Sequence, residues 1–219
     1  YLNKVITDES FTYINFGTAV EPYIKEKLIE IFQQVGIIKS DKDYNLAKDK
    51  NDFPDFTLLS SEFPIAIEIK AGNHSQKKDG KWRTCKNSEN DMGTFNSWSD
   101  KLNKFGGDFI YYLFIEYDFN DQYKKIVDVK IAPFYKFLGL TSNGLLKYRE
   151  KDGNLRPKDF RANSPITSLR VFEALLPKTA IYRSKKIITK HLNLLSVEER
   201  YEVLKEIARK ENYVLEKKQ

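Results

Sequence analysis

Between residues 54 and 70 the chain reads Pro54-Asp55-Phe56-Thr57-Leu58-Leu59-Ser60-Ser61-Glu62-Phe63-Pro64-Ile65-Ala66-Ile67-Glu68-Ile69-Lys70. Residues 55–59 and 63–70 are rich in β-branched and large apolar side chains, and a short polar run separates them. Such a pattern is typical of two strands joined by a turn. We therefore predict an antiparallel hairpin here.

The register of this hairpin decides which side chains meet. A ladder centred on Ser61 and Glu62 places Asp55 opposite Glu68. Directly opposed residues share a face of the sheet, with Cβ atoms roughly 4.5 to 5.5 Å apart. A slip of one residue would send the two acids to opposite faces.

Within the second strand, alternation adds a third group to the same face. Side chains two residues apart point the same way, so Lys70 lies beside Glu68. The opposite face is predicted to be buried and carries Ile65, Ile67 and Ile69.

Two carboxylates and an ammonium on one face suit metal-assisted hydrolysis of phosphodiester bonds. Paired carboxylates can hold a divalent ion at about 2.1 Å. The ion lowers the pKa of bound water and stabilises charge on phosphoryl oxygens, while a neighbouring ammonium favours hydroxide. The alternative is structural: Asp55 ends a strand-entry turn, and Glu68 and Lys70 form a solvated strand face.

Pro54-Asp55 followed by Glu68-Ile69-Lys70 resembles the motif of the PD-(D/E)xK nuclease superfamily, which includes restriction endonucleases and DNA-repair nucleases. The resemblance covers residues 54–70. It implies that Asp55, Glu68 and the main-chain carbonyl of Ile69 bind Mg²⁺, with Mn²⁺ able to substitute. It also implies that Lys70 orients and helps to deprotonate the attacking water.

Composition indicates an ordinary globular protein. The 219 residues are 41% hydrophobic, enough for one domain with a core over about residues 17–135 and peripheral additions over 145–212. Cys85 is the only cysteine, and His74 and His191 are the only histidines. These counts exclude a disulfide framework and argue against a zinc cluster, which leaves carboxylate chemistry.

The longest apolar run, residues 109–115, is far shorter than the roughly 20 residues that span a bilayer. No secretory signal opens the sequence, and no glycine-rich phosphate-binding loop is present. We therefore expect a cytoplasmic, prokaryotic protein without a membrane partner or a nucleotide cofactor.

A formal charge of +6 favours a polyanionic partner, although a solvated basic surface is an equally good explanation. Basic residues cluster directly after the predicted catalytic strand, and a polar segment rich in amides and hydroxyls follows over residues 87–98. Such groups can contact phosphates and read base edges, but they are also common in polar loops. The DNA-contact candidates are Asn73, His74, Lys77, Lys78, Lys81, Arg83, Lys86, Asn87, Asn90 and Asp91.

Upstream, residues 18–35 show the 3.6-residue period of an amphipathic helix that should pack on the sheet. Glu21 falls on its apolar stripe, where a carboxylate needs a partner. Many PD-(D/E)xK nucleases carry an extra helical acid near the metal, and Glu21 is the first candidate, with Glu26 second. The alternative is that Thr18 and Glu21 form a capping box.

The other predicted elements complete an α/β fold with a mixed central sheet, flanking helices and a helical C-terminal region. Residues 108–117 and 124–132 should form a second hairpin at the centre of the sheet. Residues 147–156, around the Asp152-Gly153 turn, form either a DNA-facing ribbon or a solvated hairpin. Helices are predicted over 164–176, 184–192 and 196–210, the last opened by a capping box at Ser196 and Glu199.

Together these features predict a type II restriction endonuclease that cuts double-stranded DNA with Mg²⁺. A homodimer is expected, since a palindromic site matches a two-fold symmetric protein. The alternatives are a repair or recombination nuclease, such as a mismatch nickase or a junction resolvase, and a non-catalytic DNA-binding protein on a nuclease-like fold.

Overall fold

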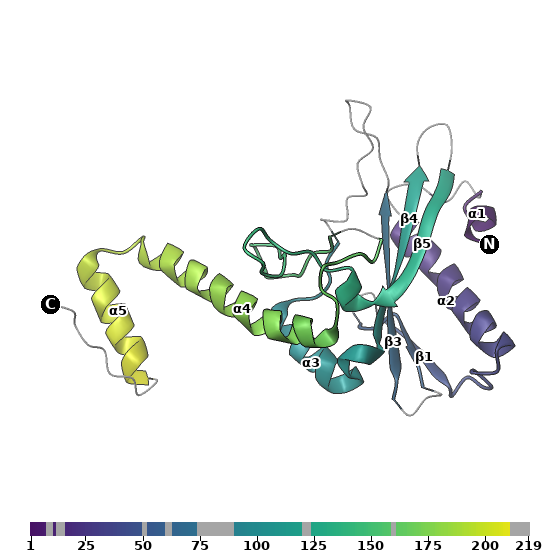
Figure 1. Ribbon diagram of the computed structural model, residues 1–219, viewed down its shortest axis with the longest axis horizontal. Coiled ribbons are helices and arrows are strands. Elements are labelled where there is room, and N and C mark those ends of the chain that lie inside the picture. The colour runs from purple at the N-terminus through teal and green to yellow at the C-terminus, as the bar shows by residue number, and fades with distance from the viewer. Residues whose placement is uncertain are drawn as a thin grey trace. The chain divides into compact units, whose positions relative to one another are not determined.

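The computed structural model describes residues 1–7, 11, 16–49, 52–59, 63–73, 90–119, 124–158 and 161–210. The chain divides into two compact units, residues 1–176 and 177–219. The first unit contains a sheet with helices, and the described part of the second is helical (Figure 1). That residues 1–219 form a single domain stays a prediction.

Among the described residues, the first unit has one mixed sheet of five strands in the order β1-β2-β3-β4-β5. The strands are β1 (Tyr44–Leu46), β2 (Phe56–Leu58), β3 (Ile65–Asn73), β4 (Ile110–Phe119) and β5 (Lys124–Pro133). Neighbouring strands are antiparallel except for β3 and β4, which are parallel. The predicted α/β class with a mixed central sheet is confirmed.

The register of the β2–β3 hairpin is the one predicted. Thr57 pairs with Ala66, and Phe56 pairs with Ile67. Continuing this ladder by one residue places Asp55, which immediately precedes β2, opposite Glu68. The first strand is shorter than the one predicted over residues 55–59, because β2 spans only Phe56–Leu58.

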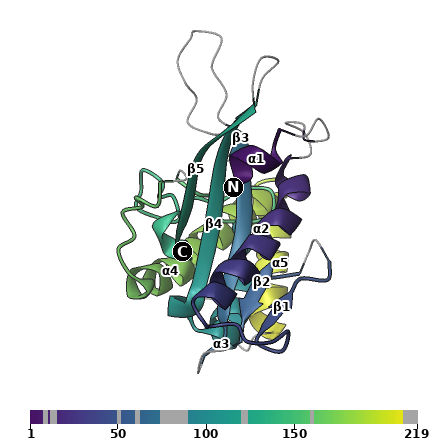
Figure 2. The same ribbon diagram turned by 90° about the vertical axis from the view of Figure 1, so that its right-hand side faces the viewer.

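One face of the sheet is covered by α2 (Phe16–Gln34), which confirms the helix predicted over 18–35 (Figure 2). Val20, Ile24 and Leu28 pack with Ile67 and Ile69 in one apolar cluster. The apolar stripe was predicted to be buried along its whole length, but its last side chains, at positions 31 and 35, are exposed.

The opposite face, which carries Glu68 and Lys70, is covered by α3 (Phe95–Phe105). Residues 95–98, expected in a polar segment, instead form its first turn. Thr94 caps the helix by accepting a hydrogen bond from Ser97 N at 3.3 Å, and Trp98 is fully buried, stacked on Phe134 at 4.1 Å between ring centroids. Burial of Trp98 therefore fixes the helix against the sheet.

The predicted second hairpin is present as β4 and β5, but it is not the centre of the sheet. β3 is the central strand, because β1 and β2 add to its other side. β5 lies at an edge, and its apolar residues Val127, Val129 and Ile131 are exposed. Apolar density is therefore not a guide to strand order in this sheet.

Residues 138–158 form a turn-rich segment beside α3. The Asp152-Gly153 turn forms as predicted, with Gly153 N donating to Arg149 O at 2.8 Å. The hairpin is not a solvated one, because Leu146 and Leu155 are fully buried in the cluster that contains Trp98.

The two helices predicted over 164–176 and 184–192 are one continuous helix, α4 (Leu169–Leu192). Ser164 does not cap it, since the Ser164 hydroxyl donates to Leu138 O at 2.5 Å. Ser168 accepts from Val171 N at 3.4 Å instead. Pro177 lies inside this helix, where proline removes one backbone hydrogen bond.

The last helix, α5 (Val197–Lys210), begins with the predicted capping box. Ser196 N donates to Glu199 Oε2 at 2.8 Å, and Glu199 N donates to Ser196 Oγ at 3.2 Å. The predicted helical C-terminal region is thus confirmed. Across the described ranges, no helix is both long and apolar enough to cross a bilayer.

Candidate active site

Asp55 and Glu68 are brought together by the β2–β3 hairpin, and both are buried, with 8% and 9% of their surfaces exposed. Asp55 Oδ2 accepts a hydrogen bond of 2.6 Å from Ile69 N, the backbone amide next to Glu68. This bond fixes the Asp55 carboxylate across the end of the hairpin. The pairing of acids predicted from the sequence register is therefore present.

Lys70 lies on the same face of β3 and donates from Nζ to Glu68 Oε1 at 2.6 Å. The other carboxylate oxygen, Glu68 Oε2, is buried and has no hydrogen-bond partner among the described residues. A buried carboxylate oxygen without a donor is costly, and a cation would satisfy it.

The charges of these groups act on one another. Burial, followed by the negative charge of Glu68, raises the pKa of Asp55 to about 6, against the opposing effect of its hydrogen bond from Ile69. Burial alone would lower the pKa of Lys70, but the charge and hydrogen bond of Glu68 and the charge of Asp55 raise it. Among Asp55, Glu68 and Lys70, two carboxylates thus face one ammonium, and a bound cation would offset the remaining negative charge.

Glu21 on α2 contributes to this field. Its charge raises the pKa of both Asp55 and Lys70, while its own carboxylate is paired with Lys25 on the next turn. The alternative capping box is wrong, because α2 begins at Phe16 and Thr18 therefore lies inside the helix.

The two carboxylates of Asp55 and Glu68 suit Mg²⁺ better than they suit a metal ion whose ligands are all protein side chains. No trio of His, Cys, Asp or Glu within the described ranges is grouped closely enough to hold an ion. Mg²⁺ is commonly bound by one or two carboxylates together with waters and substrate phosphates. Asp55 and Glu68 supply that number of carboxylates, and the buried Glu68 Oε2 is available to a cation.

Two further residues of the site were not predicted. Tyr112 on β4 pairs with Glu68 in the parallel ladder and is fully buried, with its hydroxyl donating to Met92 O at 3.3 Å. Lys101 on α3 is within the electrostatic influence of Asp55 and Glu68. Helical spacing from Trp98 would have indicated Lys101, since positions 98, 101 and 105 share one side of a helix.

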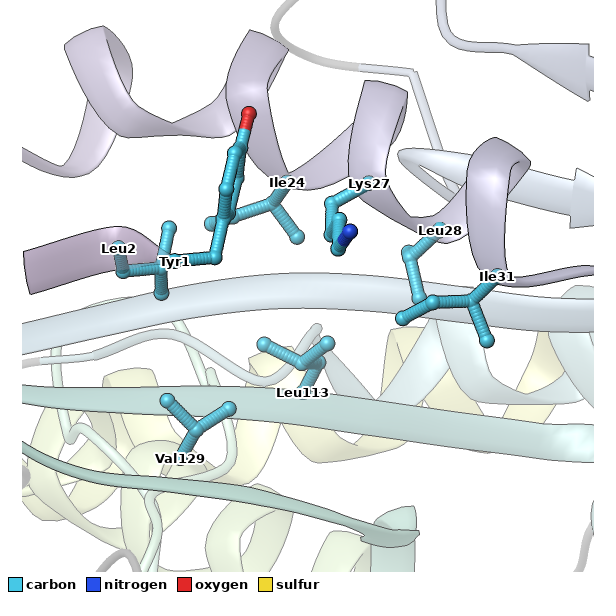
Figure 3. Close-up of a pocket in the computed structure, with 8 residues that line it drawn as sticks. All are labelled: Tyr1, Leu2, Ile24, Lys27, Leu28, Ile31, Leu113 and Val129. Carbon is cyan, nitrogen blue, oxygen red and sulfur yellow. The ribbon is translucent and has the colours of Figure 1, made fainter. Parts of the chain in front are cut away.

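An apolar cavity of about 150 Å³ lies elsewhere, between α1 (Leu2–Val5), α2 and the sheet (Figure 3). Leu113, which lines it, pairs with Ile69, so the cavity is on the face opposite Glu68. Its described lining residues include no acid, and the charged side chain among them is that of Lys27. It is separate from the candidate active site.

Comparison with known proteins gives a match in structure alone. No family model matches the chain, and no curated protein matches its sequence. A solved structure, NlaIV restriction endonuclease, superposes with a TM-score of 0.52 at 19% identity, over 76% of this chain and 65% of that one. The chain has a restriction-endonuclease-like fold. It spans 65% of the length of this structural relative.

On this restriction-endonuclease-like fold, most of the predicted DNA-contact candidates lie outside the described residues, namely His74, Lys77, Lys78, Lys81, Arg83, Lys86 and Asn87. Asn73 ends β3. Asn90 Nδ2 donates to Ala71 O at 3.4 Å, and Asp91 is paired with Arg149 and Arg156, each at 2.9 Å. These contacts join residues 90–91 to β3 and to the 138–158 segment, and the DNA-contact roles stay predictions.

Proposed function

We propose that this protein is a Mg²⁺-dependent endonuclease of the PD-(D/E)xK type that hydrolyses phosphodiester bonds of double-stranded DNA. The carrying observation is the buried Oε2 of Glu68 beside Asp55, for which no described residue supplies a hydrogen bond, with Lys70 hydrogen-bonded to the same carboxylate. The restriction-endonuclease-like fold supports the proposal. The three residues lie at the β2–β3 hairpin, and β3 is the central strand of the sheet.

Each residue of the set has a separate role. Asp55, Glu68 and the main-chain carbonyl of Ile69 would hold Mg²⁺, which when bound neutralises phosphoryl oxygens and acidifies water. Lys70 keeps its proton at neutral pH, because Glu68 raises its pKa. Its ammonium therefore orients the attacking water by donating to it, and favours the hydroxide form through its charge rather than by taking up the proton.

Within nucleases, we favour a sequence-specific type II restriction endonuclease. The structural relative is named as a restriction endonuclease, and Asn90 places a polar side chain against Ala71 of β3. A homodimer would let two such sites cut both strands of a palindromic sequence. Mn²⁺ should substitute for Mg²⁺, since it accepts the same oxygen ligands.

Incubation of the protein with plasmid DNA and Mg²⁺ should give discrete fragments. Ca²⁺ should instead support DNA binding without efficient cleavage, because it prefers more ligands and a looser geometry than Mg²⁺. Gel analysis of the products and fluorescence anisotropy with a labelled duplex measure the two effects. An inactive protein in Mg²⁺, tested on plasmid, branched and mismatched duplexes alike, would contradict the proposal.

The same assay separates the alternatives. Cleavage confined to branched or mismatched duplexes would replace restriction by repair or recombination. Equal cleavage rates in Ca²⁺ and Mg²⁺ would contradict the roles given to Asp55 and Glu68.

A further inference from the structure

Lys101 lies on the face of the sheet that carries the candidate active site. Its helix, α3, packs through Trp98 and Phe105 into the cluster that contains Tyr112, the β4 partner of Glu68. The Lys101 ammonium lies 3.7 Å from the ring centroid of Phe53, two residues before Asp55. A cation from a distant helix thus sits beside the turn that presents Asp55.

Unlike the ammonium of Lys70, this ammonium has no anionic partner in the part of the chain that the structure describes. Lys70 is hydrogen-bonded to Glu68, whereas the contacts of Lys101 within the described residues are the faces of Phe53 and of Trp98, at 3.7 and 5.0 Å. Burial lowers the pKa of Lys101 to about 8, and the charges of Glu68 and Asp55 only partly oppose this effect. A half-buried cation held by aromatic rings remains able to accept an anionic ligand.

The backbone leaves room for this ammonium at Gly93. A Cβ added there would lie 2.9 Å from Lys101 Nζ and 3.3 Å from Trp98 Nε1. Gly93 also has a backbone φ of +94°, which residues other than glycine rarely adopt. Glycine at this position therefore keeps clear the space that the Lys101 side chain occupies.

We propose that Lys101 contacts the substrate, and that its ammonium binds a non-bridging oxygen of the phosphate attacked at the Asp55–Glu68 site. The assignment rests on the proposed nuclease function and names a second lysine for it. Lys70 acts on the attacking water, whereas Lys101 stabilises the negative charge that develops on the phosphoryl oxygens. A fixed cation aimed at developing charge is an effective form of transition-state stabilisation.

The test compares Lys101→Met, Lys101→Arg and a control, Lys104→Met, an exposed lysine on the same helix. Single-turnover cleavage in Mg²⁺ should fall about 10²- to 10³-fold for Lys101→Met, because one charge-stabilising donor is removed. Lys101→Arg should recover at least part of that loss, and the control should cut at close to the parent rate. DNA binding in Ca²⁺ should show a salt slope smaller by about one for Lys101→Met.

These readouts separate substrate contact from a structural role. Methionine matches the length of the aliphatic stem and suits aromatic neighbours, so thermal unfolding should show a folded Lys101→Met variant. If the parent cuts DNA and folded Lys101→Met cuts at the same rate, this inference is overturned and the nuclease proposal stands. If the parent cuts none of the tested DNAs, both are overturned.

Discussion

Replacing Glu68 by glutamine is expected to lower the Mg²⁺-dependent cleavage rate by about 10³-fold or more, because it removes the charge that we propose binds the metal. Glutamine has the same size, and its amide oxygen can still accept a hydrogen bond from Lys70. A loss would therefore reflect the missing charge rather than altered packing. Single-turnover cleavage of a duplex that the parent cuts measures the effect.

DNA binding without metal gives the complementary readout for this variant. Glu68→Gln should bind at least as tightly as the parent, since a buried negative charge near the phosphates has been removed. Glu173→Gln, at an exposed position of α4, is the matched control and should retain parental cleavage. A Glu68→Gln variant that cuts within about tenfold of the parent in Mg²⁺ would show that Glu68 does not carry the proposed role.

The hairpin at the centre of the site was predictable because its determinants are local. Alternation of apolar and polar residues decides which face of the sheet each side chain takes, and the separation of the two strands in the sequence decides their register. The observed pairing of Thr57 with Ala66 follows from these two constraints. The capping box of α5 was predictable for the same reason, since Ser196 and Glu199 are one turn apart.

Features that depend on distant parts of the chain were not predictable in this way. Helical spacing places Lys101 on the same side of α3 as Trp98, but it does not show what that side contacts. The packing of Trp98 against Phe134 and Phe172, which positions α3, involves residues far away in the sequence. The position of β5 at an edge depends on how many strands add beyond β3. The continuity of α4 through Pro177 was not predicted either, because the two helices were expected to be separate.

Substitution of Asp55 is expected to have opposite effects on the free energy of unfolding and on cleavage activity. Burial and the charge of Glu68 raise its pKa from an ordinary 3.8 to about 6, so the fold favours the protonated carboxyl. Above pH 6 the carboxyl is ionised in both the folded and the unfolded protein, and the folded state bears the full cost of that charge. As the pH falls from 6 to 4, protonation in the folded state removes the cost.

Asp55→Asn should therefore stabilise the protein in EDTA at pH 7.5 while it abolishes cleavage in Mg²⁺. The pKa difference sets an upper limit of about 3 kcal/mol on the gain in unfolding free energy, and we expect about 1 to 3 kcal/mol. The asparagine oxygen can still accept the hydrogen bond from Ile69 N, so the hairpin end should remain intact. Urea unfolding at pH 7.5 and pH 4 measures the gain, which should shrink towards zero at the lower pH.

Mg²⁺ links the two effects of this substitution. The ion should stabilise the parent, because binding to the folded state neutralises the repulsion between Asp55 and Glu68, and should stabilise Asp55→Asn much less. A variant less stable than the parent in EDTA at pH 7.5 would contradict the argument, as would a gain that is unchanged at pH 4. The expected pattern is that of a site whose charges destabilise the empty fold and are retained for the cation they bind.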